Sequence, residues 1–213
     1  MSIVRKAAQV TAIGLGVITT VVSASGTISA FFNPVRIAPA HASPPTAVVA
    51  DQLFDTFKST CYDLMPETAA VERHATASGW TAITGLSLRM LMPQDGAKSL
   101  KAWQLPAVEG RAAMTVVVSI SDISAELADA TPDFAKSDVY GCSVIPGAIA
   151  DHDALGRNIA GLIGRAHDGV NDAGSLQSHD WVGQNATLSV ILSHYRPKQG
   201  AGAGMLAMLA LTK

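Results

Sequence analysis

Three His-Asp dipeptides are the residues of this chain whose types could do chemistry. An imidazole beside a carboxylate can bind zinc, or can act as a general base that the carboxylate orients. The dipeptides lie in the second half of the chain: His152-Asp153, His167-Asp168 and His179-Asp180. On a single helix, His152 and His167 would lie about 22 Å apart, so they cannot share a metal ion unless that helix breaks. His167 and His179 can meet, because glycines interrupt the chain between them.

These residues also have a purely structural explanation, which we favour. Asp151 and Asp153 suit the N-terminus of a helix, and His167 near its C-terminus would be a favourable cation. His179 is then an ordinary loop residue. We therefore assign no catalytic, cofactor-binding or metal-binding residue and expect no cofactor. The candidates for a metal or catalytic site, if there is one, are His167, His179, Asp168 and Asp180.

Other patterns add no chemistry. His194 lies at the end of an otherwise apolar strand face, a position that is commonly exposed to solvent. The acidic stretch 122–138 lacks the spacing and the central glycine of an EF-hand loop. Gly85-Leu86-Ser87-Leu88-Arg89 lacks the last glycine of a nucleophile elbow. The sequence contains no H-E-x-x-H, no P-loop and no G-x-G-x-x-G after a strand.

The first 42 residues have the pattern of an export signal. Arg5 and Lys6 precede an uncharged run over residues 7–32, and two overlapping A-x-A triplets end at Ala42. We expect cleavage after Ala42, which makes the protein periplasmic or secreted, with residues 43–47 as a linker. The alternative is an uncleaved inner-membrane anchor over residues 7–32, which is long enough to cross a bilayer and would leave the domain outside the cytoplasm.

Charge and cysteine content fit that compartment. Cleavage would remove three basic residues and no acidic one, leaving 12 basic and 17 acidic side chains. This balance argues against nucleic acid or an anionic membrane as a partner. Cys61 and Cys142 are the two cysteines of the chain, and an even count in an exported protein predicts a disulfide.

Hydrophobic periodicity predicts the elements that position these residues. Helical spacing covers residues 48–64 and 66–78 and returns in a stripe from Leu155 to Ala166. Period-two alternation predicts strands at 86–92, 99–105, 111–121, 138–145, 186–195 and 205–212. The segments 122–136 and 169–183 are expected to be an acidic connection and a loop. Residues 48–213 are therefore expected to form a single α+β domain, with an antiparallel sheet of about five to six strands and two N-terminal helices and one later helix packed on one face.

One family resemblance accompanies these patterns. Phe57-x-x-x-Cys61, an Ala-rich helix ending at Gly79-Trp80, and the later Cys142 resemble short, largely uncharacterised exported proteins of proteobacteria. The resemblance implies export and supplies no catalytic residues. We expect a non-enzymatic envelope domain that binds a small apolar ligand or another envelope protein. The alternative is a metal-dependent or His/Asp-based hydrolase.

Overall fold

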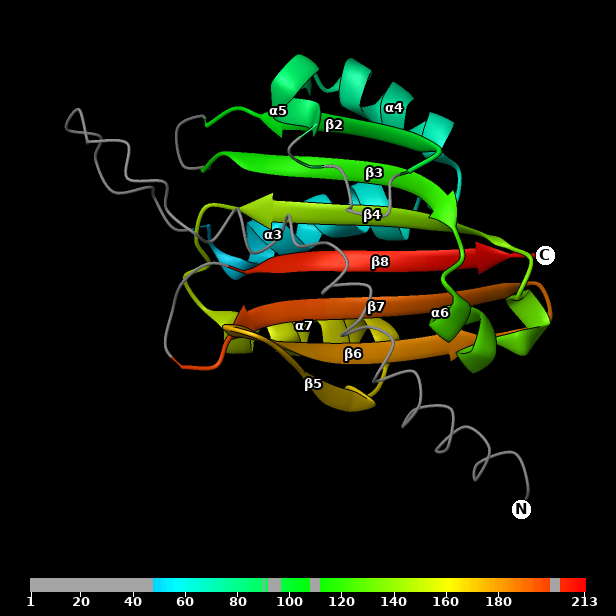
Figure 1. Cartoon of the computed structure of the whole chain (residues 1–213). Helices are drawn as coiled ribbons and strands as arrows, with labels where there is room; N and C mark the ends of the chain where they lie inside the picture. Colours follow the sequence, from blue (N-terminus) through cyan, green and yellow to red (C-terminus); the bar gives the residue numbers. More distant parts are fainter. Residues whose placement is uncertain (1–47, 90, 92–96, 108–111, 200–203) are drawn as a thin grey trace.

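The centre of the protein is one antiparallel sheet, seen here in a computed structural model (Figure 1). The structure describes residues 48–89, 91, 97–107, 112–199 and 204–213. In these residues the strand order is β1-β2-β3-β4-β8-β7-β6-β5. The strands are β1 (Thr81–Ile83), β2 (Ser99–Leu105), β3 (Met114–Asp122), β4 (Asp138–Pro146), β5 (Gly169–Ala173), β6 (Leu176–Gln184), β7 (Leu188–Pro197) and β8 (Met205–Thr212).

Short helices pack around this sheet. The α-helices are α3 (Ala50–Phe57), α4 (Thr68–Ala77), α5 (Gly85–Arg89), α6 (Ala125–Ala130) and α7 (His152–Ile163). A π-helical turn, η1 (Lys58–Tyr62), continues α3, and a 3₁₀ turn, η2 (Pro132–Phe134), follows α6. The α+β class with a single antiparallel sheet agrees with the sequence. The described residues hold eight strands rather than five or six.

Helices α3 and α7 cover the same face of the sheet, behind it in Figure 1. The core there joins Leu53 and Phe57 of α3 and Leu155 and Ile159 of α7 to the inward side chains of the strands. On β3 those side chains alternate as the sequence predicts: Met114, Val116 and Val118 are buried. The two helices also touch each other, since Asn158 Nδ2 donates to Asp51 Oδ1 at 2.8 Å. This layer fixes where α7 can lie over the sheet.

Helix α6, which the sequence analysis does not predict, covers the opposite face (Figure 1). Leu127 of α6 and Phe134 of η2 pack with Val139, Ile191 and Leu211. The segment 122–136, which its acidic residues led us to expect as an irregular connection, therefore contains a helix. Its start is marked by Ser124, whose hydroxyl accepts from Leu127 N at 3.2 Å as a capping residue does.

Two further expectations are wrong. Residues 85–89 form the helix α5 instead of a strand, because the alternating apolar side chains have no core to face: Leu86 is 75% exposed. Residues 169–183 form most of the hairpin β5–β6 instead of a loop, turning at Gly174 with a positive φ of 73°. There the buried positions hold polar residues such as Ser178 and Asp180, so hydrophobic alternation could not reveal the strand.

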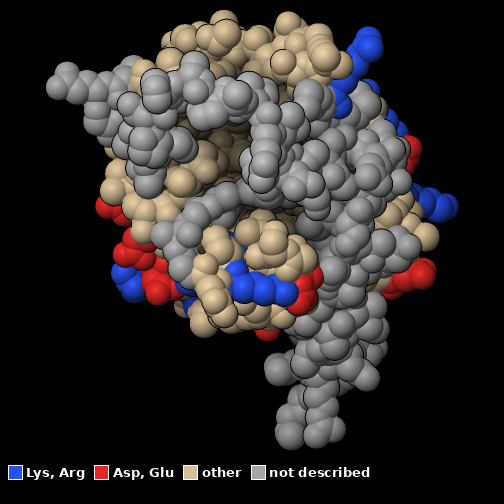
Figure 2. All heavy atoms as spheres, turned by 60° about the vertical axis from the view of Figure 1, so that its left-hand side comes forward, with Lys and Arg blue, Asp and Glu red and all other residues tan. Residues whose placement is uncertain are grey.

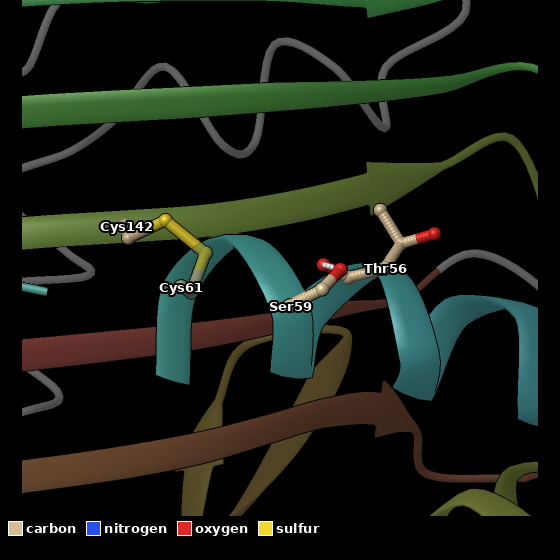
Figure 3. Close-up of a disulfide and its surroundings, with 4 residues drawn as sticks. All are labelled: Thr56, Ser59, Cys61 and Cys142. Atoms are coloured by element: carbon tan, nitrogen blue, oxygen red, sulfur yellow. Dashed lines mark hydrogen bonds between the residues drawn. A yellow bond between two sulfur atoms is a disulfide. The ribbon is translucent and has the colours of Figure 1, made fainter. Parts of the chain in front are cut away.

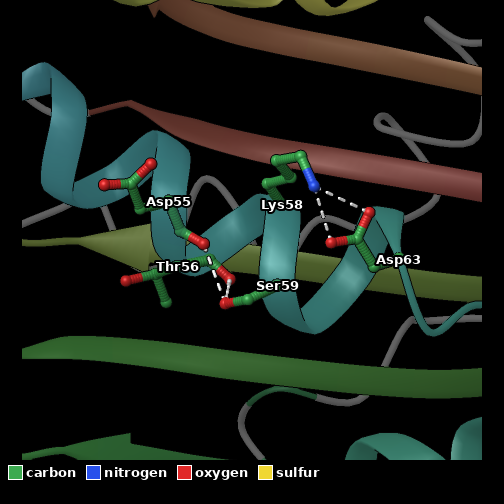
Figure 4. A network of polar contacts seen from close by, with 5 residues as sticks. All are labelled: Asp55, Thr56, Lys58, Ser59 and Asp63. Carbon is green, nitrogen blue, oxygen red and sulfur yellow. Dashed lines mark hydrogen bonds and ion pairs between the residues drawn. The ribbon is translucent and has the colours of Figure 1, made fainter.

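A disulfide joins Cys61 of η1 to Cys142 of β4, as the sequence predicts, with the Cα atoms 5.5 Å apart (Figure 3). Polar contacts brace the same turn (Figure 4). Lys58 Nζ pairs with Asp63 Oδ2 at 2.7 Å, and Ser59 Oγ donates to Asp55 O at 2.8 Å. The bridge ties the first helix to the middle of the sheet.

The structure does not describe the N-terminal segments about which the sequence makes predictions. The signal peptide 1–42, the linker 43–47 and the alternative anchor over residues 7–32 all lie outside the described residues. Within the described part of the chain, every helix is too short or too polar to cross a bilayer.

Candidate functional site: a row of four histidines

Four imidazoles line up between α7 and the strands β6 and β7. Neighbouring ring centroids are 5.3 Å apart for His152 and His194, 6.2 Å for His194 and His179, and 4.5 Å for His179 and His167. We call these four residues the histidine row. They come from parts of the chain up to 42 residues apart, so the fold and not local sequence brings them together.

Each member is placed by a different feature of the fold. His152 is the first residue of α7, whose N-terminus is capped by Asp151: its Oδ1 accepts from Asp153 N at 2.9 Å and from Ala154 N at 2.8 Å. His179 of β6 and His194 of β7 are direct partners in the strand register, so their side chains stand together on one face. That face is the one α7 covers, because the next partners along it, Trp181 and Leu192, belong to the core beneath α7.

His167 lies in the segment that leads from α7 to β5. Helix α7 ends at Gly164, whose φ of 77° is the left-handed conformation of a helix C-cap. Arg165 then fastens the segment to β6, since its Nη2 donates to Val182 O at 2.7 Å and its carbonyl accepts from Trp181 Nε1 at 3.1 Å. The His167 ring rests edge-on against Trp181, 5.9 Å between centroids. His167 therefore lies beyond the helix end and not within its last turn.

The contact between His152 and His194 is the tightest part of the row. His152 Nδ1 lies 3.0 Å from His194 Nε2, a hydrogen bond in which one of the two nitrogens must carry the proton. Both side chains are buried, at 4% and 1% exposure. The chain allows this approach at Gly204, where a Cβ would lie 2.6 Å from both His152 Cε1 and Tyr195 O. His194 was expected at a wet strand end; the N-terminal turn of α7 covers it instead.

Burial keeps the inner imidazoles neutral. Loss of solvent is the main cause that lowers the pKa of His194 to about 3, and the neighbouring His152 and His179 lower it further. Burial, followed by the charge of His167, lowers the pKa of His179 to about 4. His194 Nδ1 and His179 Nε2 are buried in the described structure without a hydrogen-bond partner. His194 and His179 are therefore neutral at neutral pH.

The aspartates beside the row are held elsewhere. Asp153 Oδ1 pairs with Arg196 Nη1 at 2.6 Å, and this bond lowers the pKa of Asp153. Asp168 pairs with Arg165 and also accepts from Val182 N at 2.7 Å. Asp180 follows His179 on a strand and so faces the opposite side of the sheet. Each carboxylate has a structural partner of its own.

Asp180 sits in a separate polar cluster on that opposite face. Its Oδ2 accepts from Asn171 Nδ2 at 2.6 Å and from Ser178 Oγ at 3.0 Å. Burial raises the pKa of this carboxyl group. Of the four candidate residues named from the sequence, the fold thus brings His167 and His179 together and turns Asp168 and Asp180 to other partners. In the described part of the chain, no three His, Cys, Asp or Glu side chains are arranged to hold a metal ion.

The sequence did not indicate that His152 and His194 would lie in contact. His152 and His194 lie 42 residues apart, and no local pattern links them. A signal for His194 was present: it continues the inward face of β7 after Leu188, Val190 and Leu192. His179 was taken for a loop residue because its strand was not recognised.

Charges of both signs lie beside the row, in the ion pairs of Arg165 with Asp168 and of Arg196 with Asp153. On the part of the face that Figure 2 shows and the structure describes, acidic and basic side chains are interspersed.

Comparison with protein-family models, with curated proteins and with solved structures finds no match for this chain.

Proposed function

We propose that this protein is an exported, disulfide-stabilised domain of the cell envelope that acts by binding another envelope protein or a small apolar ligand, and not by catalysis. The observation that carries the proposal is that the carboxylates beside the histidine row are already engaged. A catalytic imidazole is normally oriented by a carboxylate and aimed at a nucleophile or a water. Here Asp153 and Asp168 are bound to Arg196 and Arg165 instead.

The buried disulfide supports the compartment. Both cysteines are at most 1% exposed, and structural disulfides persist in oxidising compartments. This fits the export signal expected over residues 1–42, from which the mature chain would begin at Ser43.

The test is to purify the protein from the native envelope and record its intact mass, its thiol content and its metal content. We expect a chain that begins at Ser43, has no alkylatable thiol and hydrolyses no ester, phosphate or peptide reporter above the buffer blank. A full-length species retained in membranes would favour the anchor over residues 7–32.

The hydrolase alternative has its own decisive outcome. Stoichiometric zinc or reporter hydrolysis that is present in the wild type and lost in the His167→Ala/His179→Ala variant would replace the binding proposal with a metal-dependent or His/Asp-based hydrolase. His74→Ala, on helix α4 and outside the row, is the matched control. A general base contributes about 10²–10⁴-fold to a rate, so its loss would be plain.

A further inference from the structure

The four-histidine row also forms the junction between α7 and the β6–β7 part of the sheet. We propose that this junction is a pH-sensitive contact, which holds α7 on the sheet while His194 and His179 are neutral and releases it when they are protonated. The inference does not depend on what the protein binds.

In the described structure, a protonated His194 would have no hydrogen-bond acceptor for its Nδ1–H. An imidazolium donates from both ring nitrogens, whereas a neutral imidazole donates from only one. His194 Nε2 faces His152 Nδ1, and His194 Nδ1 is buried without a partner. A charged His194 would therefore leave one N–H unsatisfied in the core and would repel a charged His152. Moving α7 away is the direct way to admit water to both rings.

The surrounding charges do not compensate. Asp153 is the one carboxylate whose charge favours protonation of both His179 and His194, and it is bound to Arg196, which opposes it at both. Among the described residues, the other charged groups near the row include Arg157 of α7, Arg165 and Asp168 after α7, and Asp51 of α3; Asp168 is paired with Arg165 and Asp51 accepts from Asn158. Asp180 interacts electrostatically with His167, but it lies on the opposite face of the sheet and already accepts from Asn171 and Ser178. On β8, the neighbouring inward residues Leu206 and Met208 are apolar. Protons added to His194 and His179 thus create positive charge where each nearby carboxylate of the described residues already has a partner.

Release of α7 can be local. The disulfide joins η1 to β4, in a different part of the sheet, and the helix α3 stays attached through it. Helix α7 is held by Leu155 and Ile159, by its contact with α3, by the exposed ion pair of Asp153 with Arg196 of β7 and by the row. Regions of a protein held by few buried contacts open at a lower free energy than the whole fold. Opening here would expose the core residues Leu192 and Trp181 beneath α7.

The test is amide hydrogen exchange of the oxidised protein at pH 7.5 and pH 5.0, expressed as protection factors so that the intrinsic pH dependence of exchange is removed. If His194 regains an ordinary pKa of about 6.5 on opening, it alone makes opening about 30-fold more frequent at pH 5.0. His179 adds a smaller factor, because its ring is only partly buried. Amides of β3 and β4 are expected to keep their protection.

Variants then locate the effect. His194→Gln should remove most of the pH dependence in α7, and His179→Gln a smaller part. The matched control is His74→Gln, whose ring packs against Trp80 of a different region at 5.3 Å and should leave α7 unchanged.

Three outcomes would overturn the proposal. Wild-type α7 could show the same protection factors at both pH values, or α7 and β4 could lose protection together. Undiminished pH dependence in both row variants would also refute it. If His194→Gln does not fold, His179→Gln and the wild-type comparison of α7 with β4 still decide the question.

Discussion

A glycine decides how closely the two buried histidines can approach. Gly204 lies where the ring of His152 of α7 approaches the backbone of β7, and its missing side chain leaves room for that ring. Glycine is used here for close approach, since any Cβ would overlap a backbone oxygen that cannot rotate away. The geometry of the row at residue scale therefore depends on a position that itself does no chemistry.

Gly204→Ala should destabilise the protein by about 1–3 kcal/mol, the usual cost of forcing extra atoms into a packed site. The added methyl group would lie 2.6 Å from Tyr195 O and 2.9 Å from Ile149 Cδ1. Urea unfolding at pH 7.5 measures the change. Gly183→Ala on β6 is the control, because nothing lies within 4 Å of the added atom there, and it should change stability by less than about 0.5 kcal/mol. Equal effects of the two substitutions would contradict the packing described at Gly204.

At the scale of elements, the sequence predicts those parts whose buried residues are apolar. Strands β2 and β8 match the residues expected for them, and α3 and α7 carry their apolar stripes toward the sheet. The hairpin β5–β6 was missed because Ser178 and Asp180 occupy its buried positions. The pairing of His152 with His194 was missed for a different reason: it depends on where α7 lies over the sheet, and single-chain periodicity does not contain that placement.

The disulfide is the covalent link between two of these elements. Replacing both cysteines with Ala should lower the free energy of unfolding by about 2–5 kcal/mol, because the bridge closes a long loop in the unfolded chain. Urea unfolding of the Cys61→Ala/Cys142→Ala variant beside the oxidised wild type gives the difference. Reduced wild type is the control and should unfold near the variant. A variant as stable as the oxidised wild type would show that the bridge contributes nothing to the fold.

At the scale of the whole molecule, two regions behave differently toward acid. The disulfide-linked part around α3, η1 and β4 has a core of apolar side chains with the buried hydroxyl of Thr60, none of which titrates, whereas the part around α7, β6 and β7 includes buried imidazoles. Burial holds the pKa of His194 below its unfolded value of about 6.5, so the unfolded chain binds more protons in acid. The stability that neutral His194 contributes is complete above pH 6.5. It is lost as the pH falls toward about 3, by about 1.4 kcal/mol per pH unit.

The titration of His194 in the native, oxidised protein tests the account most directly. Imidazole resonances of the wild type, assigned with His194→Gln and His74→Gln, are followed by NMR from pH 8 to pH 4.5. We expect the His194 resonance to show no native-state titration down to pH 5, and the resonances of α7 to lose their native positions before those of β4. A His194 resonance that titrates smoothly near pH 6.5, with α7 still in its native position, would contradict the buried, neutral state of His194 and the pH-sensitive contact built on it.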